Sequence, residues 1–114
     1  MDFELPEGID QIRKEIRRFG ENEIEPVANE YDREEKYPHE VMDEANEMGL
    51  LGASIPVEYG GAGYSILENM IIVEELFAID PGIGFCIVAS SFGTEALQAL
   101  GTEAQQEEFL EPGA

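Results

Sequence analysis

The sequence predicts an all-α protein, an up-and-down-like bundle of five to six helices with one glycine-rich loop. Apolar residues recur at three- and four-residue steps along most of the chain, and no stretch alternates for long enough to predict a strand. Proline, glycine and capping residues divide this pattern into pieces of helical length. The 114 residues have the size of a single domain, which we assign to residues 1–114.

Three helices are predicted in the first half of the chain. One apolar stripe is formed by Ile9, Ile12, Ile16 and Phe19, and it continues through Ile24, Val27 and Tyr31. Pro26 should end or kink this helix and let it restart, because proline lacks a backbone N–H. The next helix should run from Pro38 to Met48, with Gly49 as its stop. Its inward residues should be Val41, Ala45 and Met48.

The segment from Gly52 to Tyr64 interrupts the helical pattern with one proline and three further glycines. We expect an ordered loop that is anchored by Ile55, Val57 and Tyr59. Ser65 then opens a helix, because Glu68 three residues later completes a capping box. That helix should end near Ile79 and carry Ile66, Met70, Val73 and Phe77 inward.

Asp80 and Pro81 form a second start signal, a capping side chain followed by proline at the first helical position. The helix that follows, Gly82–Phe92, has no charged residue and is expected in the interior. Gly101 then interrupts the helical pattern. Thr102 and Gln105 should cap a last helix that ends at Leu110.

The charge balance is strongly acidic. Six Lys and Arg residues, all between Arg13 and Lys36, stand against 26 Asp and Glu residues, which gives a formal net charge of -20. Nucleic acids and anionic membranes require a basic surface, so we expect neither as a partner. Such a composition favours a halophilic source over an acidic mesophilic one, because molar salt reduces the Debye length to about 3 Å and screens the repulsion.

Composition also gives expectations about the compartment. No run of about 18 apolar residues is present, so we expect no membrane span. The acidic N-terminus does not resemble a signal peptide. Cys86 is the single cysteine and has apolar neighbours, which favours a packed thiol in a reducing compartment. We therefore expect a cytoplasmic protein.

No complete active site can be assembled from the sequence. The glycines at positions 60, 61 and 63 lack the pattern of a dinucleotide or phosphate loop, so tight turns explain them better. His39 is the only histidine, which argues against a metal site. Ser90 and Ser91 have no identifiable triad partners, and Cys86 has no nearby cation to activate it. We therefore name no catalytic, cofactor-binding or metal-binding residue.

Several separated motifs resemble the amino-terminal domain of the acyl-CoA dehydrogenase family. The longest is residues 47–63, which read Glu-Met-Gly-Leu-Leu-Gly and then Pro-Val-Glu-Tyr-Gly-Gly-Ala-Gly after three residues. The others are Glu23-Ile24-x-Pro26, Glu74-Glu75-Leu76, Gly101-Thr102-x-x-Gln105 and Phe109-Leu110. One departure is Glu111, which separates Leu110 from Pro112 where the family usually has proline directly.

The resemblance implies a piece of a longer enzyme, whose FAD-binding β-domain and C-terminal helical domain are absent from this chain. Such enzymes remove an α-proton from an acyl-CoA thioester and transfer the β-hydride to FAD. By the same resemblance we expect a homo-oligomer, dimer or tetramer, with electron-transfer flavoprotein as acceptor. The isolated chain should bind no FAD and be inactive. Acyl chain length and the oligomeric state are left open.

The resemblance also implies that the helix Gly82–Phe92 forms part of the wall of the acyl-chain cavity. The candidate substrate-binding residues are Phe85, Val88, Ala89 and Phe92. A plain core helix is the alternative. Family members that act on dicarboxylic acyl-CoA carry an arginine near the start of this helix, and its absence here favours a monocarboxylic acyl group. A stand-alone helical interaction module without catalysis, and a related acyl-CoA oxidase or nitroalkane oxidase, remain open.

Overall fold

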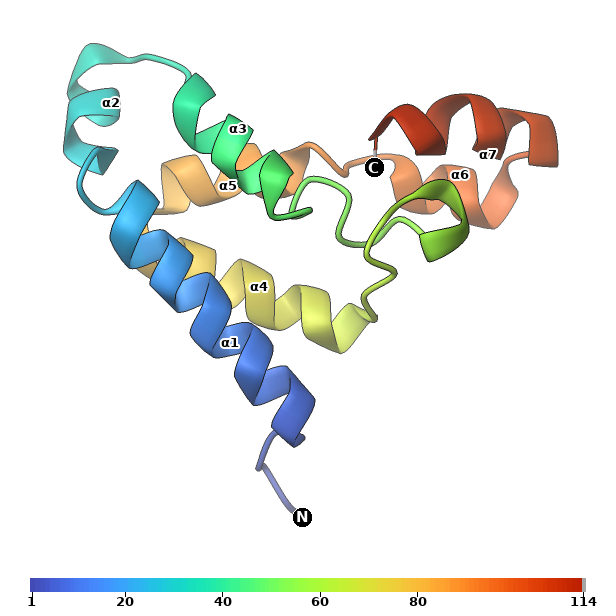
Figure 1. Ribbon diagram of the computed structural model, residues 1–114, viewed down its shortest axis with the longest axis horizontal. Coiled ribbons are helices and arrows are strands. Elements are labelled where there is room, and N and C mark those ends of the chain that lie inside the picture. The colour runs from blue at the N-terminus through green and yellow to red at the C-terminus, as the bar shows by residue number, and fades with distance from the viewer. Residues whose placement is uncertain (114) are drawn as a thin grey trace.

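The computed structural model describes residues 1–113, which fold into helices joined by turns and one long loop (Figure 1). The α-helices are α1 (Glu7–Phe19), α2 (Ala28–Glu34), α3 (His39–Glu47), α4 (Ile66–Ile79), α5 (Pro81–Ala89), α6 (Thr94–Leu100) and α7 (Glu103–Leu110). Short 3-10 turns lie at Val57–Tyr59 and Glu111–Gly113. The predicted all-helical fold is confirmed, and α6 is a helix that the sequence pattern did not predict.

The molecule is a flat body of 42 × 41 × 21 Å. Its short dimension corresponds to about two helix diameters. The helix α4 packs against both α1 and α5, while α6 and α7 pack against each other and stand to one side of the other helices (Figure 1). The main core lies between the first five helices and the loop. Its largest members include Ile16, Phe19, Ile24, Met42, Ile72, Leu76 and Ile87.

The predicted break at Pro26 is confirmed. The first helix ends with a π-helical turn at Gly20–Ile24, and α2 begins only at Ala28. Gly20 allows α1 to approach the end of α4 closely, because a Cβ atom there would lie 2.6 Å from Cγ1 of Ile79.

An ion pair that the sequence did not predict joins α1 to α4. Glu75 is only 4% exposed, and Arg17 donates from Nε and Nη2 to its two carboxylate oxygens, both at 2.9 Å. Arg13 Nε lies 3.4 Å from the same carboxylate. The hydrogen bond to Glu75, followed by its charge, raises the pKa of Arg17. This arrangement compensates for the burial of a charge that would otherwise be costly.

The inward face predicted for α4 is wrong. Ile66, Met70 and Phe77 are exposed, at 83%, 54% and 36%, whereas Ile71, Ile72 and Leu76 are buried. The helix is apolar on both faces, so its periodicity does not indicate which face meets α1 and α5. Two further predicted inward residues, Met48 at the end of α3 and Val57 in the loop, are also exposed. Ile55 is fully buried and does anchor the loop, as predicted.

The predicted helix starts are confirmed. Ser65 with Glu68, and Thr102 with Gln105, form complete capping boxes. The Asp80 carboxylate accepts from the Ile83 N–H at 2.8 Å, and Pro81 occupies the first turn.

The apolar helix α5 is shorter than predicted and is not enclosed on all sides. It ends at Ala89, and Phe92 lies in the turn before Gly93, whose φ is 93°. The segment Pro81–Leu100, with a mean hydropathy of 1.3, is long and apolar enough to cross a membrane, contrary to the expectation from composition. The core helix of a globular protein passes the same test, and here the turn divides the segment into α5 and α6. Only 17% of it is buried in this chain.

One glutamine fixes α6 and α7 to the loop. Gln106 donates to the carbonyls of Leu97, Gln98 and Gly101 at 3.1–3.2 Å, which ties the end of α6 to α7. Its Oε1 accepts from the Tyr59 hydroxyl at 3.2 Å. Burial, and then the neighbouring carboxylates, raise the pKa of Tyr59, so this donor keeps its proton to a higher pH than usual.

Candidate functional site

The close approach of α5 to α4 determines which side chains meet at the site. A Cβ atom at Gly84 would lie 2.9 Å from Cδ1 of Phe77 and 3.2 Å from the Leu76 carbonyl oxygen. Glycine is therefore required at the crossing point of the two helices. Because the backbones touch here, the side chains of α5 one turn later reach the groove beside α4.

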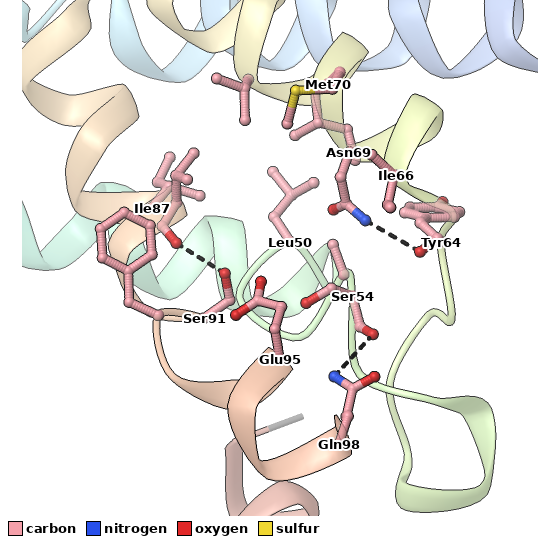
Figure 2. Close-up of a pocket in the computed structure, with 15 residues that line it drawn as sticks. Leu50, Ser54, Tyr64, Ile66, Asn69, Met70, Ile87, Ser91, Glu95 and Gln98 are labelled. Atoms are coloured by element: carbon pink, nitrogen blue, oxygen red, sulfur yellow. Dashed lines mark hydrogen bonds between the residues drawn. The ribbon is translucent and has the colours of Figure 1, made fainter. Parts of the chain in front are cut away.

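A cavity of about 400 Å³ lies between α4, α5, α6 and the loop that follows α3 (Figure 2). Most of its lining is apolar and includes Leu50, Met70, Val73, Ile87, Val88 and Phe92. The polar lining residues include Ser54, Asn69, Glu95 and Gln98. A concave, largely apolar cavity of this size with a few polar groups is typical of a small-molecule site.

Two of the four predicted residues line this cavity. Val88 and Phe92 belong to its wall, whereas Phe85 and Ala89 do not. Phe85 is 52% exposed, and its ring meets the Phe92 ring edge-on with centroids 5.8 Å apart. The substrate-binding role of the four residues stays a prediction.

The sequence pattern missed most of the opposite wall. Ile66, Met70 and Val73 were recognised as a stripe, but they were assigned to the core instead of to a cavity. The signal that could have corrected this is the second apolar stripe on the same helix, Ile72 and Leu76, since two stripes require two neighbours. Glu95 and Gln98 gave no signal, because α6 was not predicted.

The polar side chains of the cavity are mostly tied to backbone carbonyls. Asn69 donates to the carbonyls of Tyr64 and Ser65 at 3.1 and 3.0 Å. Ser91 donates to the Val88 carbonyl at 2.9 Å, and Gln98 donates weakly to the Ser54 carbonyl at 3.4 Å. The site thus combines a largely apolar lining with a few polar groups, of which the Ser54 hydroxyl has no hydrogen-bond partner within residues 1–113.

The glycine-rich loop has its backbone donors occupied. The N–H groups of residues 60 to 63 donate to carbonyls of residues 57, 56, 52 and 55, at 2.9–3.3 Å. A phosphate cradle needs several such donors to be free. Gly60 and Gly63 have φ of 90° and 65°, so the interpretation as tight turns is confirmed.

Within residues 1–113, no three His, Cys, Asp or Glu side chains are placed to hold a metal ion. His39 is exposed and packs edge-on against Tyr37, with ring centroids 4.7 Å apart. The half-buried Cys86 is a free thiol. The described residues therefore offer a binding surface and no assembled set of reacting groups.

Comparison with known proteins gives one consistent result. A family model described as "Acyl-CoA dehydrogenase, N-terminal domain" matches residues 6–114. The short-chain-specific acyl-CoA dehydrogenase of Clostridium acetobutylicum is 35% identical over 113 residues, which cover 98% of this chain and 30% of that protein. The acryloyl-CoA reductase (NADH) of Anaerotignum propionicum is 36% identical over 110 residues, 96% of this chain and 28% of that protein.

Solved structures agree with the sequence comparison. The butyryl-CoA dehydrogenase of Megasphaera elsdenii matches with a TM-score of 0.86 and 34% identity, over 98% of this chain and 30% of that one. A chain solved in a study of the electron transferring flavoprotein of Acidaminococcus fermentans matches with a TM-score of 0.90 and 33% identity. That match covers 100% of this chain and 30% of the other. The present chain thus spans about 30% of the length of these relatives.

Proposed function

Since this chain belongs to the family of acyl-CoA dehydrogenase N-terminal domains, we propose that it forms one wall of the acyl-chain cavity in a flavin-dependent acyl-CoA dehydrogenase. The full enzyme would introduce a double bond between the α and β carbons of an acyl-CoA thioester. The observation that carries this proposal is the groove itself, in which Val88 and Phe92 face the exposed side of α4. Transfer of an alkyl chain from water to such an apolar wall is favourable, because burial of each CH₂ group contributes about 0.8 kcal/mol.

A second part of the proposal concerns packing between domains. Outside the groove, Phe77 on α4 and Phe85 on α5 leave an apolar face exposed. Large exposed apolar patches are uncommon on monomeric proteins and mark contact surfaces. We assign this face to contacts with the remainder of the longer enzyme, whose relatives are about three times as long as this chain. A stand-alone interaction module would use the same face, and it remains the second candidate.

The flavin belongs to another part of the enzyme in this proposal. FAD would accept the hydride when bound, but the residues described here do not fit its phosphates, because the N–H groups of the glycine-rich loop are already used. No lysine or arginine follows Lys36 to hold an anion near the groove. A homo-oligomer and an electron-transfer flavoprotein as acceptor complete the proposed enzyme.

The groove assignment is tested by ligand binding to the 114-residue chain. The ligand is octanoyl-pantetheine, which has an uncharged alkyl end and lacks the phosphates of CoA. Val88→Ala and Phe92→Ala should each weaken its binding by about three- to tenfold, since each removes apolar contact area. Isothermal titration calorimetry gives the affinities, and heteronuclear NMR locates the shifted amides.

Phe109→Ala is the matched control, because Phe109 is a similarly exposed phenylalanine on α7 that does not line the groove. Equal affinities for wild type, Phe92→Ala and Phe109→Ala would contradict the assignment. Amide shifts confined to the far side of α1 would contradict it as well.

A further inference from the structure

The groove contains one charged side chain, and its charge is negative. Of the residues that line the cavity, Glu95 is the only one among Asp, Glu, Lys and Arg. Figure 2 shows its carboxylate pointing from α6 into the cavity, on the side where Ser91 and Ser54 lie. A ligand that fills the groove therefore meets this carboxylate.

No cation compensates the charge of Glu95 within residues 1–113. The ion pairs there join Arg13 and Arg17 to Glu75, Lys14 to Asp10, and Lys36 to Glu34. Among the neighbouring polar side chains, Ser91 donates to the Val88 carbonyl and Gln98 to the Ser54 carbonyl, whereas the Ser54 hydroxyl has no hydrogen-bond partner among the described residues.

Glu95 is itself exposed, so its charge acts on ligand groups within several ångströms and is screened by salt and water at longer range. Much of the lining is apolar, including Leu50, Met70 and Val73, and none of the lining residues carries a positive charge. A like charge placed within several ångströms of a carboxylate is repelled more strongly beside such a wall than in open water.

We propose that Glu95 is a specificity-determining residue, which excludes acyl groups with an anionic end and restricts the groove to acyl chains with an uncharged end. This inference rests on the proposed function, since it assumes that the acyl chain enters this groove. In this proposal Glu95 on α6 repels an anionic acyl end. The absence of an arginine near Asp80 is a different feature, because it only means that no cation at the start of α5 attracts such an end.

Glu95 also has a plain structural explanation. It lies in the first turn of α6, where a carboxylate interacts favourably with the helix dipole. A helix-stabilising role alone would change the stability of the chain but not its preference between two ligands. The discriminating measurement is therefore a ratio of affinities.

The test compares octanoyl-pantetheine with suberoyl-pantetheine, which has the same carbon chain ending in a carboxylate. Wild-type chain should prefer the octanoyl thioester. Glu95→Gln should raise the affinity for the suberoyl thioester by about five- to tenfold relative to that for the octanoyl thioester, so the readout is the ratio of the two affinities. Calorimetric titrations at low and moderate salt give the four dissociation constants.

Glu103→Gln is the matched control, because it changes the net charge equally but Glu103 does not line the groove. An equal gain in suberoyl affinity for both variants would show an effect of net charge, and the inference on Glu95 would then be wrong while the proposed function stands. Unchanged discrimination in Glu95→Gln would overturn the inference in the same way. Failure of wild type and variants to bind either thioester would instead contradict the proposed function.

Discussion

Glu75 is the only charged side chain among residues 1–113 that lies in the core. A buried carboxylate is tolerated only when its charge is paired and its oxygens are hydrogen-bonded. Arg17 on α1 meets both conditions, because it forms a bidentate contact with the Glu75 carboxylate. Because the pKa of Arg17 is raised, its charge persists through neutral pH and would be lost only as the pH rises through that pKa in strong alkali.

The role of this pair can be measured by removing one partner and then both. Arg17→Met should lower the midpoint of thermal unfolding, because it leaves Glu75 buried with only Arg13 nearby. Adding Glu75→Leu should restore much of the loss, since the unpaired buried charge is then gone. Arg18→Met, on the same helix and exposed, is the control and should have little effect. Indistinguishable midpoints for Arg17→Met and Arg18→Met would show that the pair does not hold α1 to α4.

At the scale of elements, the loop between α3 and α4 depends on close backbone contact. A Cβ atom at Gly61 would overlap the carbonyl oxygen of Ile55 and lie 2.6 Å from the carbonyl carbon. Ile55 is fully buried, so this backbone has little freedom to move away. The loop in turn supports one wall of the groove and holds Tyr59 against Gln106.

Two alanine substitutions are expected to change the free energy of unfolding in opposite directions. Gly61→Ala should lower the free energy of unfolding by about 1–3 kcal/mol, because the added methyl group overlaps backbone atoms. Gly8→Ala, in the first turn of α1 with open space around it, should raise it by up to about 0.5 kcal/mol. Urea unfolding measures both values. A neutral Gly61→Ala would mean that the loop adjusts more easily than its packing indicates.

At the scale of the whole molecule, the distribution of charge is the dominant feature. The net charge is -20, and every lysine and arginine lies between Arg13 and Lys36. The last helices carry only negative charges, among them the exposed Glu103, Glu107 and Glu108 on α7. Repulsion between such charges disfavours a compact chain at low ionic strength.

We propose a halophilic source on this basis, and salt dependence tests it. The midpoint of thermal unfolding should rise between low and molar potassium chloride. Salt screens the repulsion between carboxylates, which destabilises the folded state more than the unfolded state. The triple variant Glu103→Gln, Glu107→Gln, Glu108→Gln should show a smaller rise, with a higher midpoint at low salt. A flat or falling midpoint for the wild-type chain would count against the proposal.

The sequence predicted only part of the candidate site. The family resemblance, with the absence of charge between Gly82 and Phe92, gave four candidates, of which Val88 and Phe92 line the groove and Phe85 and Ala89 do not. Ser54 and Glu95 could not be found, because they reach the groove through a loop and a short helix whose directions depend on distant contacts. The arrangement of Phe85, exposed beside Phe92, likewise depends on the turn at Gly93.

The sequence alone determined where α4, α5 and α7 begin, because the capping contacts at their N-termini are local. Ser65 and Glu68, Thr102 and Gln105, and Asp80 with the Ile83 N–H each close within three residues. Only the tertiary structure decided which side of α4 is buried and that Glu75 enters the core. An α-helix with apolar residues on both faces has no preferred face of its own, so the positions of α1 and α5 make that choice.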